Sequence, residues 1–198
     1  MIIGITGGIG SGKSTIARQL SLMGYFVYDT DREAKRLIVS DAQVRQQISA
    51  LFGPEVYQDG VYQTHIVAKR VFEQQQSTLA ELNAIVHPAV RADIRSCLAS
   101  YAHKTSIMAF VECAILYEAG IDQLCDMVVA VTAPEQLRIE RTIARDHTDI
   151  EKVRARMHAQ DIESAIRSAD IVINNDGSQS IPELCRELLH QLQLHIGI

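Results

Sequence analysis

The chain has 198 residues, of which 47% are hydrophobic and 22% are charged, and its formal net charge at pH 7 is -5. This length suits one domain with a substantial core and room for inserted segments. The acidic balance argues against general nucleic-acid binding, because phosphate backbones select basic surfaces. A local basic pocket for a small anionic ligand is still compatible with this composition.

The cysteines and the apolar runs exclude several further classes. The four cysteines form no CxxC pair, so neither a zinc site nor a compact disulfide framework is indicated. No segment approaches the roughly 20 apolar residues that span a bilayer. The N-terminus lacks the basic segment of a signal peptide. We therefore expect a cytoplasmic protein with reduced thiols and no membrane association.

The first segments predict a βαβ unit. Residues 2–6 (IIGIT) are a short apolar run that suits a buried strand, and residues 14–23 keep helical spacing up to Gly24. Residues 25–28 (YFVY) suit a second strand, which should be parallel to the first.

The stretch 31–104 is expected to be mostly helical. It contains a turn signal at 59–60 (Asp-Gly) and two helical patterns, 64–73 and 77–101, separated by a polar linker. Pro88 interrupts the second pattern, so a helix boundary or a kink is expected there.

Strands resume in the second half of the chain. Apolar runs predict strands at 107–112, 127–132 and 169–174, and a charged helical region covers about 134–168 between the last two. Residues 181–196 predict an amphipathic C-terminal helix.

A glycine-rich loop follows the first strand. Residues 7–14 read GGIGSGKS, in which Gly7, Gly12, Lys13 and Ser14 match the phosphate-binding pattern G-x-x-x-x-G-K-[ST] in its strand-to-helix context. The glycines let successive N–H groups point into one concavity, to which the helix adds its positive end. Lys13 can reach the β- and γ-phosphates, and the Ser14 hydroxyl can ligate Mg²⁺. The motif predicts a nucleoside triphosphate site.

Together these patterns predict an α/β protein with a three-layer P-loop NTPase fold and a parallel sheet. We expect one domain over residues 1–198, with a helical insertion at about 31–104 and a helical lid at about 136–168.

Two carboxylates follow the second predicted strand. The strand is expected to end in Asp29-Thr-Asp31, so that Asp29 and Asp31 share one face and point to the mouth of the phosphate loop, at the sheet edge where ligands bind in α/β folds. One of them could accept a proton from an acceptor hydroxyl. The alternative is that either residue caps the helix that follows.

Three arginines lie one helical turn apart in the charged region. Arg138, Arg141 and Arg145 are spaced i, i+3, i+7 and therefore share one helical face. Such a face is often a solvated surface. After the penultimate strand of a P-loop fold it indicates a lid, which brings arginines over the transferring phosphoryl group and excludes water.

With these features the sequence closely resembles the dephospho-CoA kinase family over nearly its whole length. The motifs that carry the resemblance are ITGGIGSGKST (5–15), Asp29-Thr-Asp31, Leu82-Asn83 with His87-Pro88, Arg141 with Arg145-Asp146, Gln160, Arg167, and ADIVINN (169–175). The P-loop occurs in many families, whereas the paired LN and HP elements and the last strand are much more particular.

The resemblance implies transfer of the γ-phosphoryl group of Mg²⁺-ATP to the ribose 3′-hydroxyl of dephospho-CoA, the last step of coenzyme A synthesis. It implies three catalytic residues, with Asp31 as the base beside Lys13 and Arg141. Segment 31–104 would bind the acceptor and 136–168 would be the lid. The implied partner is this small molecule, with no nucleic acid and no membrane, and the protein would be a monomer or a weak homo-oligomer.

The resemblance also assigns binding residues. Those for ATP are Gly8, Ile9, Gly10, Ser11, Gly12, Lys13, Ser14, Thr15, Arg145 and Asn175, the last of these beside the adenine. Those for Mg²⁺ are Ser14 and Glu112, and those for the acceptor are Asp29, Asp31, His87 and Arg141. His87 with Pro88 could instead be a packed histidine at a helix kink.

The sequence departs from the family pattern at four positions. Glu112 and Ala114 replace an aspartate and a proline after the third strand of the sheet, Thr64 stands where many members have an arginine, and Arg138 replaces a glutamine. These changes concern acceptor, metal and lid contacts and leave the phosphate loop intact.

Two other functions are alternatives to this one. Another small P-loop kinase, acting on a nucleoside monophosphate or on shikimate, shares the loop and lid but would not need the insertion with Asn83, His87 and Pro88. A GTPase-type switch would need a guanine-reading N-K-x-D segment, which the sequence lacks.

Overall fold

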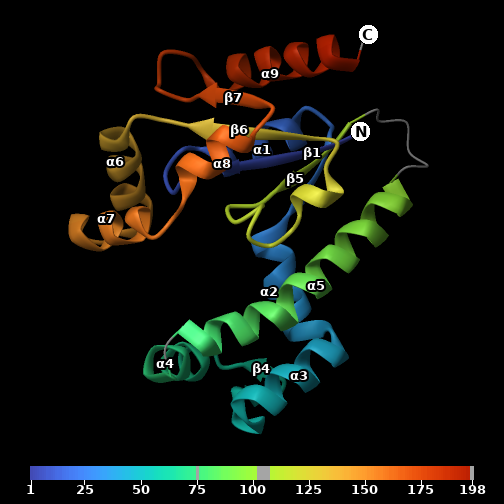
Figure 1. Ribbon diagram of the computed structural model, residues 1–198, viewed down its shortest axis with the longest axis vertical. Coiled ribbons are helices and arrows are strands. Elements are labelled where there is room, and N and C mark those ends of the chain that lie inside the picture. Colours follow the sequence, from blue (N-terminus) through green and yellow to red (C-terminus); the bar gives the residue numbers. More distant parts are fainter. Residues whose placement is uncertain (75, 102–107, 197–198) are drawn as a thin grey trace. The chain divides into compact units, whose positions relative to one another are not determined.

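The computed structural model describes residues 1–74, 76–101 and 108–196. The chain divides into two compact units: Met1–Tyr28 together with Lys104–Ile198, and Asp29–His103. Figure 1 shows the elements of each unit. Within the described residues, no helix combines the length and the apolar character needed to cross a membrane.

The first unit is built on a five-stranded sheet with the strand order β2-β5-β1-β6-β7. The strands are β1 (Ile2–Gly7), β2 (Phe26–Asp29), β5 (Ala109–Glu112), β6 (Met127–Thr132) and β7 (Ile171–Asn174). β1 pairs in parallel with both β5 and β6, and β6 pairs in parallel with β7. Because β1 is central, the loop after it leaves the middle of the carboxyl edge, where ligands bind in open α/β sheets.

Helices cover the sheet on both faces. The helices of this unit are α1 (Lys13–Leu22), α6 (Glu135–Asp146), α7 (Ile150–His158), α8 (Ile162–Ser168) and α9 (Ile181–Ile196), with a short 3-10 turn at Asp122–Leu124. On one face, α1 and α9 pack together and bury Ile16, Leu20, Leu188 and Leu192 against the sheet. On the other face, α8 and the segment after β5 approach β1 so closely that a Cβ on Gly4 would lie 2.7 Å from Leu116.

The second unit is helical with one short hairpin. Its elements are α2 (Thr30–Ser40), α3 (Ala42–Phe52), a 3-10 turn (Pro54–Val56), β3 (Tyr57–Gln58), β4 (Val61–Tyr62), α4 (Thr64–Gln74) and α5 (Gln76–Tyr101). Asp59 and Gly60 connect β3 and β4 with φ angles of 51° and 80°. Two left-handed residues in a row form the turn that matches the twist of a tight hairpin.

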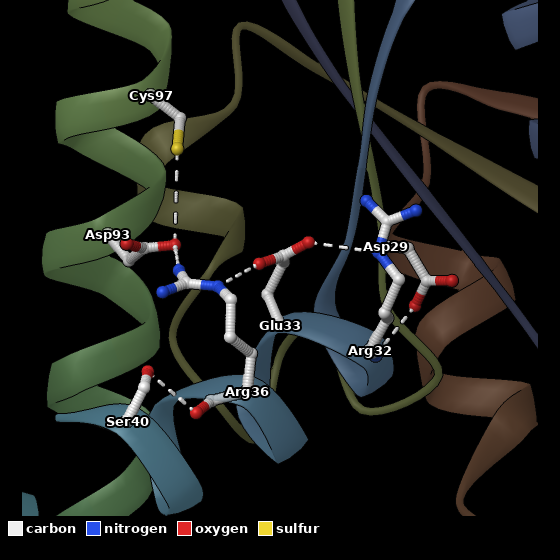
Figure 2. A network of polar contacts seen from close by, with 7 residues as sticks. All are labelled: Asp29, Arg32, Glu33, Arg36, Ser40, Asp93 and Cys97. Atoms are coloured by element: carbon white, nitrogen blue, oxygen red, sulfur yellow. Dashed lines mark hydrogen bonds and ion pairs between the residues drawn. The ribbon is translucent and has the colours of Figure 1, made fainter.

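A charged network joins α2 to α5 in this unit (Figure 2). Arg36 donates one hydrogen bond to Glu33 Oε2 at 2.5 Å and another to Asp93 Oδ2 at 2.7 Å. Arg32 donates from Nε to the other oxygen of Glu33 at 2.9 Å. The hydrogen bond from Arg36 is the main reason why the pKa of Glu33 lies below its ordinary value, with Arg32 adding to the effect against partial burial.

The predicted α/β fold with a parallel sheet is confirmed. Of the two expectations for Pro88, the helix boundary is wrong, because α5 continues through this residue, and the kink stays a prediction. Proline removes one backbone hydrogen bond from a helix, and buried Val86, Val90 and Ile94 hold both halves of α5 in the second unit. Residue 107, the first of the expected third strand of the sheet, lies outside the described residues.

Candidate active site

The glycine-rich loop connects β1 to α1. The helix begins at Lys13, and Gly12 takes its N-cap position with a φ of 95° and no side-chain capping bond. Gly10 has a φ of 76°. These left-handed conformations favour glycine, and an N-terminus without a side-chain cap can offer its N–H groups to an anion.

A cavity of about 460 Å³ opens beside this loop. The residues that line it are Gly10, Gly12, Lys13, Ser14, Thr15, Arg141, Arg145, Asn175 and Ile181. Its volume falls in the range of small-molecule sites, and three cationic side chains converge on it. The cavity therefore has the charge and the size to accept a polyphosphate.

Ser14 and Glu112 are in direct contact. The Ser14 hydroxyl donates to Glu112 Oε1 at 3.0 Å, and Glu112 is only 5% exposed at the end of β5. A serine hydroxyl and a carboxylate are oxygen donors of the kind that Mg²⁺ takes, usually with phosphate and water completing its shell. The described residues contain no cluster of three or more His, Cys, Asp or Glu side chains that could hold a metal. This pair therefore fits a magnesium ion that is also bound by nucleotide phosphates.

Arg138 contacts the backbone of the phosphate loop. Its Nε donates to the carbonyl of Ile9 at 2.9 Å, and a Cβ on Gly8 would lie 2.4 Å from its NH2 group. The N–H of Ile9 donates in turn to Gln160 Oε1 at 3.0 Å. Both polar groups of Ile9 are thus engaged by side chains from the expected lid region, and burial lowers the pKa of the Arg138 guanidinium.

The expectation of three arginines over one phosphate site is therefore wrong for Arg138. α6 places Arg141 and Arg145 on the cavity but turns Arg138 to the loop backbone. One face of a helix is wide enough for its side chains to contact different groups. Gly8, Ile9 and Ser11, expected to bind ATP, do not line the cavity among the described residues.

Arg145 is held by acidic and basic neighbours. Its Nε donates to Asp146 Oδ1 at 2.6 Å, and Arg156 of α7 donates to Asp146 Oδ2 at 2.9 Å. The hydrogen bond that Arg145 donates to Asp146 raises the pKa of Arg145, while the two arginines hold the pKa of Asp146 well below its usual range. Arg145 therefore remains cationic at the rim of the cavity.

Asn175 lies at the centre of the polar contacts around the loop. It is 3% exposed, its Nδ2 donates to the carbonyl of Ser11 at 2.8 Å, and its own carbonyl accepts from Arg141 NH1 at 3.0 Å. The family resemblance implies a place beside the adenine for this residue, and that stays a prediction. In the structure its side chain is committed to the phosphate loop.

Asp29, Asp31 and His87 belong to the second unit, Asp29–His103. The reasoning that placed Asp29 and Asp31 on one strand face is wrong, because β2 ends at Asp29 and α2 begins at Thr30. Asp29 caps α2 by accepting from the Arg32 N–H at 3.0 Å (Figure 2), which is the alternative that the sequence allowed. Asp31 is exposed in the first turn of α2, and His87 is half-buried in α5.

The supports of the loop were the part that sequence reasoning missed. Gln160 was noted only through family resemblance, and nothing pointed Arg138 to Ile9. The usable signal was the run of glycines itself: at Gly8 and Gly10 a Cβ would lie 2.4 Å and 2.3 Å from atoms of Arg138. Glycines that the phosphate pattern does not require can mark close approach by another element.

Known proteins with similar sequences and folds place the site in a family. The family model for dephospho-CoA kinase matches residues 1–180. The dephospho-CoA kinase of Porphyromonas gingivalis is 37% identical, over 93% of this chain and 91% of that protein. That of Moorella thermoacetica is 36% identical, over 99% of this chain and 94% of that protein.

Solved structures share the fold of this chain. The protein TT1252 from Thermus thermophilus is 35% identical with a TM-score of 0.78, covering 97% of this chain and 96% of that one. Two others show the fold alone. Dephospho-CoA kinase from Campylobacter jejuni has a TM-score of 0.71 at 23% identity, covering 96% of each chain. Shikimate kinase from Acinetobacter baumannii has a TM-score of 0.59 at 16% identity, covering 98% of this chain and 93% of that one. The chain belongs to the dephospho-CoA kinase family.

Proposed function

We propose that this chain phosphorylates the ribose 3′-hydroxyl of dephospho-CoA with ATP, giving CoA and ADP, the last step of coenzyme A synthesis. The observation that carries the proposal is the cavity that gathers Lys13, Ser14, Arg141 and Arg145 in a member of this family. In the reaction the acceptor oxygen bonds to the γ-phosphorus, the bond to the β-phosphate oxygen breaks, and ADP leaves.

The phosphate chain of ATP is held by the loop and by cations. The uncapped N-terminus of α1 supplies N–H donors, and Lys13 supplies a charge within the same cavity. Arg141 and Arg145 balance the charge that spreads over the transferring group. Arg138 and Gln160 contribute indirectly, because they bind the backbone of Ile9 and so stabilise the conformation of the loop.

Ser14 and Glu112 are the residues that would hold Mg²⁺ in this proposal. When bound there with ATP, the ion neutralises charge on the β- and γ-phosphates. Glu112 carries one methylene more than the aspartate that the family pattern has, and Ser14 is already within hydrogen-bond distance of it. The longer side chain is therefore compatible with the site.

The acceptor side of the proposal rests on the second unit. We assign acceptor binding to about 31–104 and the lid to about 136–168, within one kinase domain over 1–198. Asp31 takes the proton of the 3′-hydroxyl, and its exposure in the first turn of α2 leaves its carboxylate accessible. Asp29 and His87 contribute to the acceptor site.

The same proposal covers partners and place. We infer a monomer or weak homo-oligomer that acts on a small molecule in the cytoplasm without nucleic acid, in keeping with a net charge of -5 and four free cysteines. A nucleoside monophosphate or shikimate as the acceptor is not favoured, because the relatives that match along the chain are dephospho-CoA kinases.

The test is an acceptor panel. ADP release with Mg²⁺-ATP is followed in the presence of dephospho-CoA, AMP, CMP, shikimate or no acceptor, and the product mass is determined. Turnover with dephospho-CoA alone, yielding CoA, is the expected result. Turnover with another acceptor, or equal turnover with water, would contradict the assignment while leaving the ATP site in place.

A further inference from the structure

The backbone of Asn175 is bound to the sheet, independently of the contacts of its side chain. It directly follows β7, and its N–H donates to the carbonyl of Thr132, the last residue of β6, at 2.8 Å. This bond continues the parallel pairing of β6 and β7 by one residue. The backbone of Asn175 is therefore anchored at the carboxyl edge of the sheet, next to the phosphate loop.

The side-chain amide ties this anchor to the loop. Nδ2 donates to the Ser11 carbonyl at 2.8 Å, and a Cβ on Gly12 would lie 2.1 Å from Nδ2. The approach therefore depends on glycine at position 12. The amide has one orientation that suits both neighbours, because Ser11 offers an acceptor and Arg141 offers donors. The reverse orientation would place oxygen against oxygen and N–H against N–H.

The two oxygens of Asn175 hold one guanidinium. Arg141 NH1 donates to the main-chain carbonyl at 3.0 Å, and Arg141 NH2 lies 3.4 Å from Oδ1. Two contacts from one guanidinium to one residue fix the plane of the group as well as its position. Arg141 extends from α6, and both it and Asn175 line the cavity that contains Lys13.

We propose that Asn175 is a positioning residue that sets Arg141 relative to the phosphate loop. This inference rests on the proposed function only in taking Arg141 as a group that contacts the transferring phosphoryl. The Asn175 side chain links the loop backbone to the guanidinium, because Nδ2 donates to the Ser11 carbonyl and Oδ1 accepts from Arg141 NH2. Removing the amide breaks both contacts and leaves Arg141 the bond from NH1 to the main-chain carbonyl of residue 175. One such bond does not fix the plane of the guanidinium relative to the bound phosphates.

Loss of the Asn175 amide should affect turnover more than the affinity for ATP. A displacement of about 1 Å in a group that aligns reacting atoms can cost on the order of a hundredfold in rate. The loop N–H groups and Lys13 still bind the phosphates when Asn175 is shortened. We therefore expect Asn175→Ala to lower kcat by roughly ten- to a hundredfold with KM for ATP nearly unchanged.

A double-mutant cycle separates positioning from independent action. Wild type, Asn175→Ala, Arg141→Ala and the double variant are compared for kcat and KM with ATP and dephospho-CoA. If Asn175 acts through Arg141, adding Asn175→Ala to Arg141→Ala changes kcat by less than about twofold. Asn174→Ala is the matched control, because this neighbouring asparagine is exposed and its amide contacts Asp176 instead. The control should keep wild-type turnover.

Two results would overturn the inference. One is that the two substitutions multiply in their effects on kcat. The other is that Asn175→Ala raises KM for ATP at constant kcat, as expected of a residue that contacts the nucleotide itself. If the alanine variant does not fold, Asn175→Asp completes the cycle, since it keeps the shape and the oxygen facing Arg141 but loses the donor to Ser11.

The same four proteins are also titrated with ATP by calorimetry, so the cycle is read even if dephospho-CoA is not the acceptor. In these titrations Asn175→Ala should change the affinity for ATP by less than about twofold, both alone and when added to Arg141→Ala, and a larger loss in either comparison would refute the inference. Wild type that makes no CoA would count against the proposed function alone. Wild type that makes CoA, together with independent effects of the two substitutions, would count against this inference alone.

Discussion

Arg138→Ala tests the claim that the lid region holds the phosphate loop in shape. The substitution removes the hydrogen bond from Nε to the Ile9 carbonyl, made at 2.9 Å by a half-buried guanidinium. A hydrogen bond from a charged donor contributes about 1.5–3 kcal/mol. Desolvation opposes it, because the NH2 group is buried without a hydrogen-bond partner among the described residues and burial lowers the Arg138 pKa.

The net loss expected from these opposing effects is about 1 kcal/mol, which lowers Tm by about 2–4 °C in a chain of this length. If ATP binds only the loop conformation that Arg138 stabilises, the same free energy weakens ATP binding by about fivefold. Differential scanning fluorimetry and an ATP titration measure the two effects. Arg154→Ala, which removes an exposed arginine from α7, is the control. Unchanged Tm and ATP affinity in Arg138→Ala would refute the reasoning.

Three further predictions follow from the site and from the second unit. Glu112→Gln should lower turnover and raise the Mg²⁺ concentration needed for half-maximal rate by about tenfold or more, while Glu112→Asp keeps the charge and most of the activity; an unchanged Mg²⁺ titration would exclude Glu112 from the metal site. Asp31→Asn should lower kcat by about a hundredfold or more with ATP binding unchanged, and near-normal turnover would remove Asp31 from the mechanism. Arg36 holds the pKa of Glu33 below its ordinary 4.5, so Glu33 stabilises the fold above that pH and loses this effect as pH falls. The difference in free energy of unfolding between wild type and Glu33→Gln should therefore become smaller as the pH falls below about 4.5, as measured by denaturant unfolding at a series of pH values. A difference that grows below this pH would contradict the role of the network.

Most of the first unit could be predicted because its signals are local. The strand at 127–132 and the C-terminal helix at 181–196 have the predicted bounds. The strand is a continuous apolar run, and the buried residues of the helix repeat at the helical period. The phosphate loop was equally readable, since its glycines, Lys13 and Ser14 lie within one short stretch. Local periodicity and local conformation are what a sequence displays directly.

Most of the errors arose where tertiary packing decides. α5 passes through Pro88 because buried neighbours on both sides outweigh one lost hydrogen bond. At Asp31 the error was local: β2 ends at Asp29, which caps α2, so Asp31 lies in the first turn of a helix and not on a strand. Arg138 and Asn175 contact residues 129 and 164 positions away in the chain, and no spacing rule reports such partners.

The measurement that tests the central claim most directly follows the labelled γ-phosphoryl group of ATP into dephospho-CoA. The label is located in the product by mass spectrometry and ³¹P NMR, with Lys13→Ala as the reference protein. The account predicts label on the ribose 3′-oxygen of CoA with wild type, and none above background with Lys13→Ala. Label in inorganic phosphate alone, or equal transfer by Lys13→Ala, would contradict it.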